Sequence, residues 1–147
     1  MKRLLVLALV LLVGVAFAGT GPKVTGGGTV DWPNGRVTYG FNAQQIDVSG
    51  EAKGQFQVHH RDVGGLSIHG EVLYLAVNAA TGEAWIGGAV THSDDPSYDG
   101  LEFYFEVKDG APDMVSPVTY NVGVAINALS MPALFLQEWT NGNVKIH

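Results

Sequence analysis

The sequence predicts an all-β domain, because its clearest periodic segments alternate every second residue and turn signals recur along its length. Apolar and polar residues alternate most regularly in Arg36–Gln44 and Leu101–Lys108, as in strands that bury one face. The turn signals follow one another at roughly 8–12 residues, which is typical of antiparallel sandwiches and barrels. We expect an antiparallel meander that forms a small up-and-down barrel, with a β-sandwich as the alternative.

Residues 1–18 have the pattern of a signal peptide. Two basic residues precede the aliphatic run Leu4–Val15, and the segment Ala16–Ala18 (AFA) is a small-x-small cleavage pattern. The aliphatic run is shorter than the ~20 residues that a membrane-spanning helix needs. We therefore expect cleavage before Gly19, a secreted or extracytoplasmic location, and no stable membrane span after cleavage.

The remaining ~130 residues suffice for one domain with its own core. The chain contains no cysteine, so no disulfide stabilises it. With 14 acidic and 8 basic residues its formal net charge is −6, and no run of basic residues follows the signal peptide. Nucleic acids and anionic membranes bind clustered basic residues, so the charge argues against both as partners.

We expect residues 19–28 to form a flexible, glycine-rich leader and residues 29–147 to form the single β domain. The domain opens with a short strand and a turn at Pro33-Asn34-Gly35. The next strand should point four apolar side chains inward: Val37, Tyr39, Phe41 and Ala43.

The middle of the chain, Gly54–Val77, reads as two strands joined at Gly64-Gly65. In the later strand Leu101–Lys108, we expect Leu101, Phe103, Phe105 and Val107 to point inward and Glu102, Tyr104, Glu106 and Lys108 outward. Further strands are expected at Ala84–Thr91, Val118–Ile126 and Leu134–Trp139, with Asn141-Gly142 closing a last hairpin onto Val144–His147.

The hairpin Gly54–Val77 carries the candidate metal ligands. If Gly64-Gly65 is a two-residue turn, His60 and His69 face each other, with Asp62 nearby. Imidazoles on adjacent strands can bind zinc or copper, so a weak divalent-metal site is one hypothesis. The alternative is a pair of strand histidines bonded to neighbours, because no metal-ligand spacing motif occurs. A four-residue turn would shift the register and separate the two rings.

Two acidic groups are weaker candidates for chemistry. Asp94, Asp95 and Asp99 share a loop but lack the alternating pattern of a calcium loop, which favours a solvated turn. Glu102 and Glu106 lie four residues apart on one strand, ~13 Å at strand rise, which is too far for a pair of glycosidase carboxylates. No nucleophile elbow or phosphate loop is present in the sequence.

Several strand motifs together resemble a family of secreted microbial β-domains, the post-COAP domain. The similar blocks are GRVTYGFNA (Gly35–Ala43), GQFQVHHRD (Gly54–Asp62), LSIHGEVLYLAV (Leu66–Val77), GLEFYFEVKDG (Gly100–Gly110) with the following Asp113, and NGNVKIH (Asn141–His147). The chain departs from the family pattern between Val115 and Leu134, where a charged strand of the family is missing. The resemblance implies an exported β-domain and no particular chemistry.

Two functions remain as hypotheses. The first is an exported, non-catalytic β module with a structural, adhesive or binding role toward a cell-envelope or extracellular partner. The second is a small β-barrel that binds an apolar ligand, with or without isomerase- or cyclase-like chemistry. An interior filled by aromatic residues favours the first, whereas an apolar cavity with a few convergent polar groups favours the second. We favour the first, and no cofactor is implied beyond the metal hypothesis.

Overall fold

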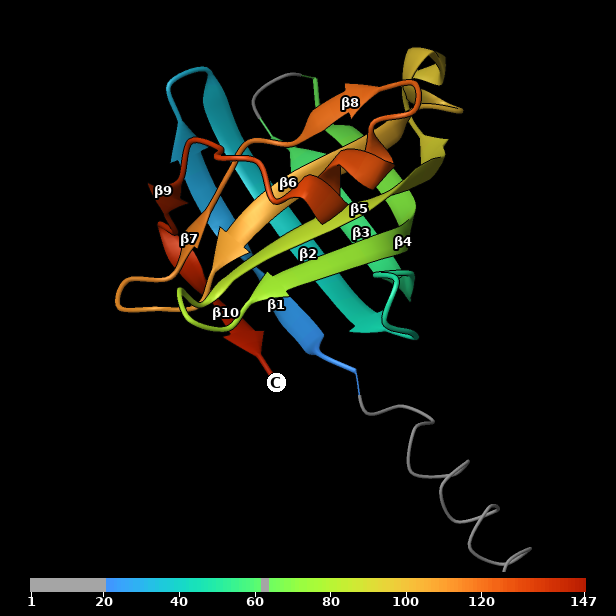
Figure 1. Ribbon diagram of the computed structural model, residues 1–147. Helices are drawn as coiled ribbons and strands as arrows, with labels where there is room; N and C mark the ends of the chain where they lie inside the picture. The colour runs from blue at the N-terminus through green and yellow to red at the C-terminus, as the bar shows by residue number, and fades with distance from the viewer. Residues whose placement is uncertain (1–20, 62–63) are drawn as a thin grey trace, which may run out of the picture.

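The computed structural model describes residues 21–61 and 64–147, which form one antiparallel sheet of 10 strands curled into a half-barrel (Figure 1). The expected all-β meander is confirmed, because β1 to β7 are neighbours in chain order and β10 returns beside β1. The strands are β1 (Lys23–Trp32), β2 (Gly35–Gln45), β3 (Ala52–His60), β4 (Leu66–Asn78), β5 (Glu83–Ser93), β6 (Glu102–Lys108), β7 (Met114–Val115), β8 (Thr119–Asn121), β9 (Gln137–Glu138) and β10 (Asn141–Ile146). Two short 3₁₀ helices are η1 (Pro96–Tyr98) and η2 (Ala125–Ser130).

The glycine-rich N-terminal region is more ordered than its composition predicts. The signal peptide expected at 1–18 lies outside the described residues, but the leader expected over 19–28 is wrong from Lys23 onward, where β1 begins. A Cβ at Gly28 would collide with the β10 backbone, and one at Gly142 would lie 2.6 Å from the Gly27 carbonyl oxygen. Glycine is therefore needed where β1 and β10 approach closely, and Asn141-Gly142 is strand rather than turn.

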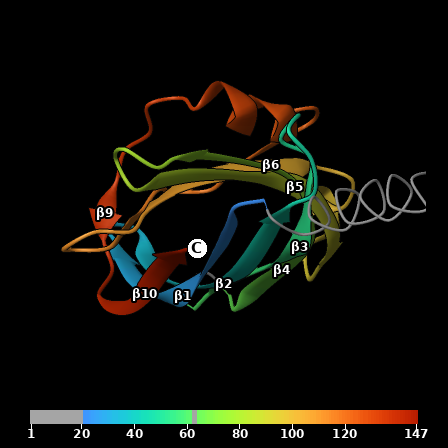
Figure 2. The ribbon, with the colours of Figure 1, turned by 60° about the horizontal axis from the view of Figure 1, so that its bottom comes forward.

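The inner face of the sheet is filled by aromatic side chains. The inward set expected in β2 is buried, as are Phe103, Phe105 and Val107 of β6. Figure 2 shows β1 to β4 curving beneath β5 and β6, so side chains of the two halves meet across the interior. Phe56 of β3 stacks on Phe103 with ring centroids 4.1 Å apart, and Phe41 of β2 meets Phe105 edge-on at 5.3 Å. These contacts hold the curled sheet together.

The outer face of β5 and β6 is covered by the C-terminal segment 116–136, which we call the strap (Figures 1 and 2). Gly87 of β5 makes room for it, because a Cβ there would collide with the carbonyl oxygen of Ala125. The Trp85 indole N–H donates to the Pro132 carbonyl oxygen at 2.8 Å. Glu106, expected to point outward, does point to the outer face, but the strap leaves it only 1% exposed.

Carboxylates close the seam between the two ends of the sheet. The final strands β9 and β10 are separated in sequence by only Trp139 and Thr140. In the loop after β6, Asp109 accepts the Ile146 backbone N–H and Asp113 accepts that of Val144, each at 2.9 Å. These two N–H groups lie on the edge of β10 that does not pair with β1, so the carboxylates replace the strand partner that this edge lacks. Among the described residues, no helix has the length and hydrophobicity to cross a bilayer.

Truncating Phe103 to alanine should destabilise the fold by about 3–5 kcal/mol, because its ring is fully buried and stacked on Phe56. Urea melts would measure the loss. The same truncation at Phe135, which is 70% exposed, is the matched control and should change the free energy of unfolding much less. A loss of only a few tenths of a kcal/mol at Phe103 would contradict the aromatic core.

Candidate functional site

The structure separates the two histidines expected to face each other. Strand β3 ends at His60 and β4 begins at Leu66, so His60 pairs with Leu66, whereas His69 pairs with Gln57. The two-residue turn at Gly64-Gly65 is therefore wrong, although both glycines have the expected positive φ, 67° and 74°. His60 shares the inner face with Val58, and His69 lies on the outer face. The metal hypothesis thus loses the geometry on which it rested.

A different histidine pair does face across two strands. His69 pairs with His92 of β5 on the outer face, with ring centroids 6.1 Å apart. His59 Nδ1 is hydrogen-bonded to the Ser67 hydroxyl at 2.7 Å. Asp62 lies outside the described residues, and within the described ranges no three histidine, aspartate or glutamate side chains are grouped to hold a metal ion.

The acidic loop before β6 satisfies its own backbone. Asp94 accepts the Ser67 N–H at 3.1 Å, which ties the loop to the start of β4. Asp95 caps η1 by accepting both the backbone N–H and the hydroxyl of Ser97, at 2.9 and 2.8 Å. These bonds hold the loop in place.

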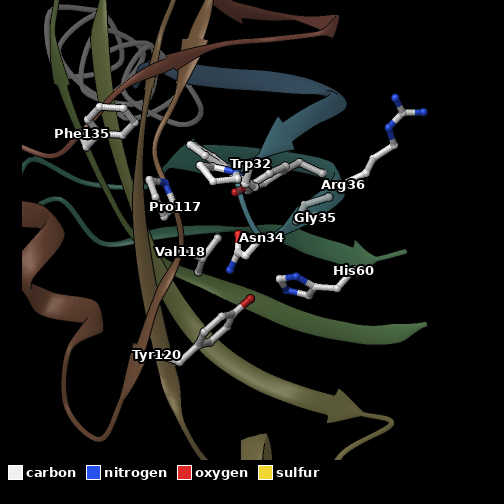
Figure 3. A pocket seen from close by; sticks show the side chains of 12 residues that line it. Trp32, Asn34, Gly35, Arg36, His60, Pro117, Val118, Tyr120 and Phe135 are labelled. Carbon is white, nitrogen blue, oxygen red and sulfur yellow. The ribbon is translucent and has the colours of Figure 1, made fainter. Parts of the chain in front are cut away.

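A pocket of about 390 Å³ opens at one end of the half-barrel, where the aromatic filling of the interior stops (Figure 3). Its walls come from the β1–β2 hairpin, the end of β3 and the strap. We call it the rim pocket; it is lined by Trp32, Pro33, Asn34, Gly35, Arg36, Val37, Tyr39, His60, Pro117, Val118, Tyr120 and Phe135.

Polar groups converge on this mainly apolar space. Tyr120 pairs with Phe103 in the sheet, which directs its side chain to the inner face. Figure 3 shows its hydroxyl pointing toward the side of the pocket where His60 and Asn34 lie. The hydroxyl oxygen is buried and, among the described residues, has no hydrogen-bond partner. By contrast, the Tyr39 hydroxyl donates to the Ser116 carbonyl oxygen at 3.2 Å. Among the described residues, the Tyr120 hydroxyl is therefore a buried polar group of the pocket that the protein leaves unsatisfied.

The pocket carries little net charge at neutral pH. Burial, and then the nearby His59, lower the pKa of His60 below its usual range. Burial strongly raises the pKa of Tyr120, so its phenol stays protonated. At the mouth, the Arg36 guanidinium is neutralised by Asp31, with Nε–Oδ1 and Nη2–Oδ2 distances of 2.7 and 3.3 Å. The resulting surface suits an uncharged ligand.

The strap that forms one wall is anchored by the buried carboxyl group of Glu106, which lies beside the half-buried Glu83. Glu106 accepts the Leu134 backbone N–H at 3.3 Å, and the next residue is Phe135 of the pocket wall. Burial, reinforced by the adjacent Glu83 carboxyl, raises the pKa of Glu106 to about 8. Glu83 shifts the opposite way, because the hydrogen bond from Glu106 lowers its pKa. The pair therefore shares one proton at neutral pH, held on Glu106.

Comparison with known proteins does not supply a function. The chain matches no protein-family model, no curated protein and no solved structure.

Sequence reasoning identified some pocket residues but not the site. Of the lining residues, the sequence singled out His60, as a candidate metal ligand. Asn34 read as a turn residue, and Tyr120 lay in an unremarkable apolar stretch. No local signal marks Tyr120, because its importance depends on the lack of an acceptor in segments distant in sequence.

The stability of the protein should fall as pH rises from about 4.5 to about 8, because folded Glu106 holds a proton that the unfolded chain releases. The stability that this proton contributes is fully present below the pKa of Glu106 in the unfolded chain and is lost as the pH rises through its pKa in the folded protein. Between these two pKa values the free energy of unfolding falls by up to about 1.4 kcal/mol per pH unit. Urea melts of wild type and Glu106→Gln across this range isolate the contribution of the Glu83–Glu106 pair, because the contributions of groups outside the pair cancel in the difference. The free energy of unfolding of Glu106→Gln should rise relative to that of wild type as the pH approaches 8. Glu138→Gln changes an exposed residue, and its free energy of unfolding should have the same pH dependence as that of wild type. Parallel curves for wild type and Glu106→Gln would contradict the shared proton.

Proposed function

We propose that the protein is an exported, non-catalytic binding module whose rim pocket holds a small apolar ligand. The observation that carries this proposal is the pocket of about 390 Å³, lined mainly by apolar and aromatic side chains, with a few polar groups directed into it. The volume is within the usual range for small-molecule sites, and the pocket opens to the surface. The aromatic core below it supplies a rigid base for the site.

The pocket combines features of both sequence hypotheses. The interior is filled by aromatic rings, as expected for a non-catalytic module, and the space left at the rim is suited to an apolar ligand. Isomerase- or cyclase-like chemistry needs a general acid and base within reach of the ligand. His60 is a neutral base there, but Tyr120 is a very weak acid because burial raises its pKa. These properties favour binding without chemistry.

Export and family membership belong to the same proposal. The N-terminal sequence pattern supports export, and a cell-envelope or extracellular partner follows from that location. The resemblance to the post-COAP domain rests on the strand motifs of the sequence, and two of these motifs are in contact in the folded chain. Its strand motif ending in Asp109 with the following Asp113 meets its terminal motif, because these carboxylates accept the N–H groups of Ile146 and Val144.

Binding at the rim pocket is tested with N-phenyl-1-naphthylamine, a neutral probe that fluoresces in apolar surroundings. Wild type should enhance its fluorescence saturably. Val118→Phe fills the pocket and should weaken binding by about tenfold or more, or roughly 1.4 kcal/mol. Val48→Phe adds the same group at a fully exposed position and is the matched control. Urea melts would verify that both variants fold. Equal binding by Val118→Phe and wild type would place the probe elsewhere and reject this site.

Export is tested by expressing the full chain in a secreting host. We expect the exported protein to begin at Gly19, because the AFA pattern precedes that residue. Intact-mass spectrometry identifies the new N-terminus. A variant with Ala16 and Ala18 both changed to Leu removes the small residues and should impair processing. Exported protein that retains residues 1–18 would contradict the signal peptide.

A further inference from the structure

The walls of the rim pocket favour a flat ring system. Trp32, Tyr39 and Phe135 contribute aromatic rings, and Val37 and Val118 contribute aliphatic surface. Phe135 is 70% exposed, so much of its ring has no protein neighbour to pack against. A planar apolar ligand would cover this surface and stack or meet the rings edge-on.

The charges around the pocket favour a neutral ligand. Among the described lining residues, Arg36 is the one with a permanent charge, and Asp31 binds its guanidinium at the mouth. Both side chains of this ion pair are 48% exposed, so it lies in solvent rather than in the apolar interior. An anionic ligand would have to compete with Asp31 and lose its hydration in an apolar site, which costs free energy.

The unpaired hydroxyl of Tyr120 indicates one polar group that the ligand should carry. A buried hydroxyl without a partner is a net cost to the folded protein. Its phenol stays protonated because burial raises its pKa, so the group it lacks is a hydrogen-bond acceptor. Two neighbouring tyrosines do not supply one: Tyr98 meets the Tyr120 ring edge-on at a centroid distance of 5.2 Å, and the Tyr39 hydroxyl donates to Ser116 without a hydrogen bond to Tyr120. A ligand that enters the pocket can supply the acceptor.

We infer that the rim pocket selects neutral, planar aromatic compounds that carry a hydrogen-bond acceptor, such as a carbonyl or ether oxygen, which binds the Tyr120 hydroxyl. This inference rests on the proposed ligand-binding function. It adds the chemical class of the ligand, and it assigns recognition of the ligand's hydrogen-bond acceptor to Tyr120. Among the described residues, the Trp139 indole N–H is a second buried, unpaired donor; the Trp139 ring packs edge-on against Tyr39 and is not part of the pocket lining.

The experiment compares two ligands of nearly the same shape, 2-acetylnaphthalene and 2-isopropenylnaphthalene, which differ by a carbonyl oxygen in place of a methylene group. Their affinities for wild type and Tyr120→Phe are measured by displacement of N-phenyl-1-naphthylamine. The acetyl compound should bind wild type about 3–10-fold more tightly than it binds the variant, which is the usual range for one neutral hydrogen bond. The isopropenyl compound should bind both proteins equally. Comparing the two proteins for each ligand cancels the difference in ligand hydration.

Two further measurements complete the test. The anion 2-naphthoate should bind wild type at least tenfold more weakly than the acetyl compound, by the charge argument. With ¹³C-labelled tyrosine, the ring-carbon resonance next to the Tyr120 hydroxyl should shift more with the acetyl than with the isopropenyl compound. This readout uses wild type, so it remains decisive if Tyr120→Phe does not fold.

The outcomes distinguish the inference from the function on which it rests. If both naphthalenes bind but the acetyl compound shows no loss in Tyr120→Phe and no selective resonance shift, the acceptor preference is wrong and the apolar pocket stands. If 2-naphthoate binds as tightly as the acetyl compound, the preference for neutral ligands is wrong. If neither naphthalene nor the fluorescent probe binds wild type, the proposed function itself fails.

Discussion

The C-terminal part of this protein depends on carboxylates that accept backbone N–H groups. Four acidic residues in and just after β6 hold five donors of the last quarter of the chain. Glu102 accepts Gly123 and Ala125, Glu106 accepts Leu134, Asp109 accepts Ile146 and Asp113 accepts Val144. The segment after β6 forms only short strands and a 3₁₀ helix, so its donors cannot all be satisfied by a sheet ladder. Side-chain carboxylates take the place of the missing strand partners.

This role explains the acidic residues that attract attention in the sequence. Glu102 and Glu106 alternate with the core residues of β6, as catalytic or solvent-exposed carboxylates also can. Their bonds to the strap show that they position backbone instead. Glu106 can do so in a nearly water-free site because it keeps its proton, with Glu83 alongside as the charged partner. A buried, isolated carboxylate would be far more costly.

The same anchors build the rim pocket. Val118, Tyr120 and Phe135 all come from the strap, whereas Trp32 and Val37 come from the β1–β2 hairpin. Tyr120 is next to Asn121, which pairs with Glu102, and Phe135 is next to Leu134, which is bonded to Glu106. The strap wall of the pocket is thus fixed to β6 at two points, while the aromatic core limits the open space to one end of the half-barrel. A site of this kind is preorganised, which reduces the ordering cost of binding.

The sequence by itself determined the main strands of the meander and the apolar side chains that β2 and β6 bury. The strands expected at Val118–Ile126 and Leu134–Trp139 are wrong, because only Thr119–Asn121 and Gln137–Glu138 pair there and Ala125–Ser130 forms a 3₁₀ helix. The alternation of β2 and β6 predicted the buried faces correctly, because side-chain direction along a strand is a local property with a period of two. Tertiary structure alone decided what depends on distant neighbours. Lys23–Gly28 reads as a leader but is strand, because its glycines allow β10 to approach. His60 and His69 are separated because the connection between β3 and β4 is longer than its two glycines suggest. Glu106 is buried and Tyr120 lacks a partner because of how the strap lies on the sheet. Such burial and pairing are set by contacts between segments far apart in the chain, which no local pattern of residues encodes.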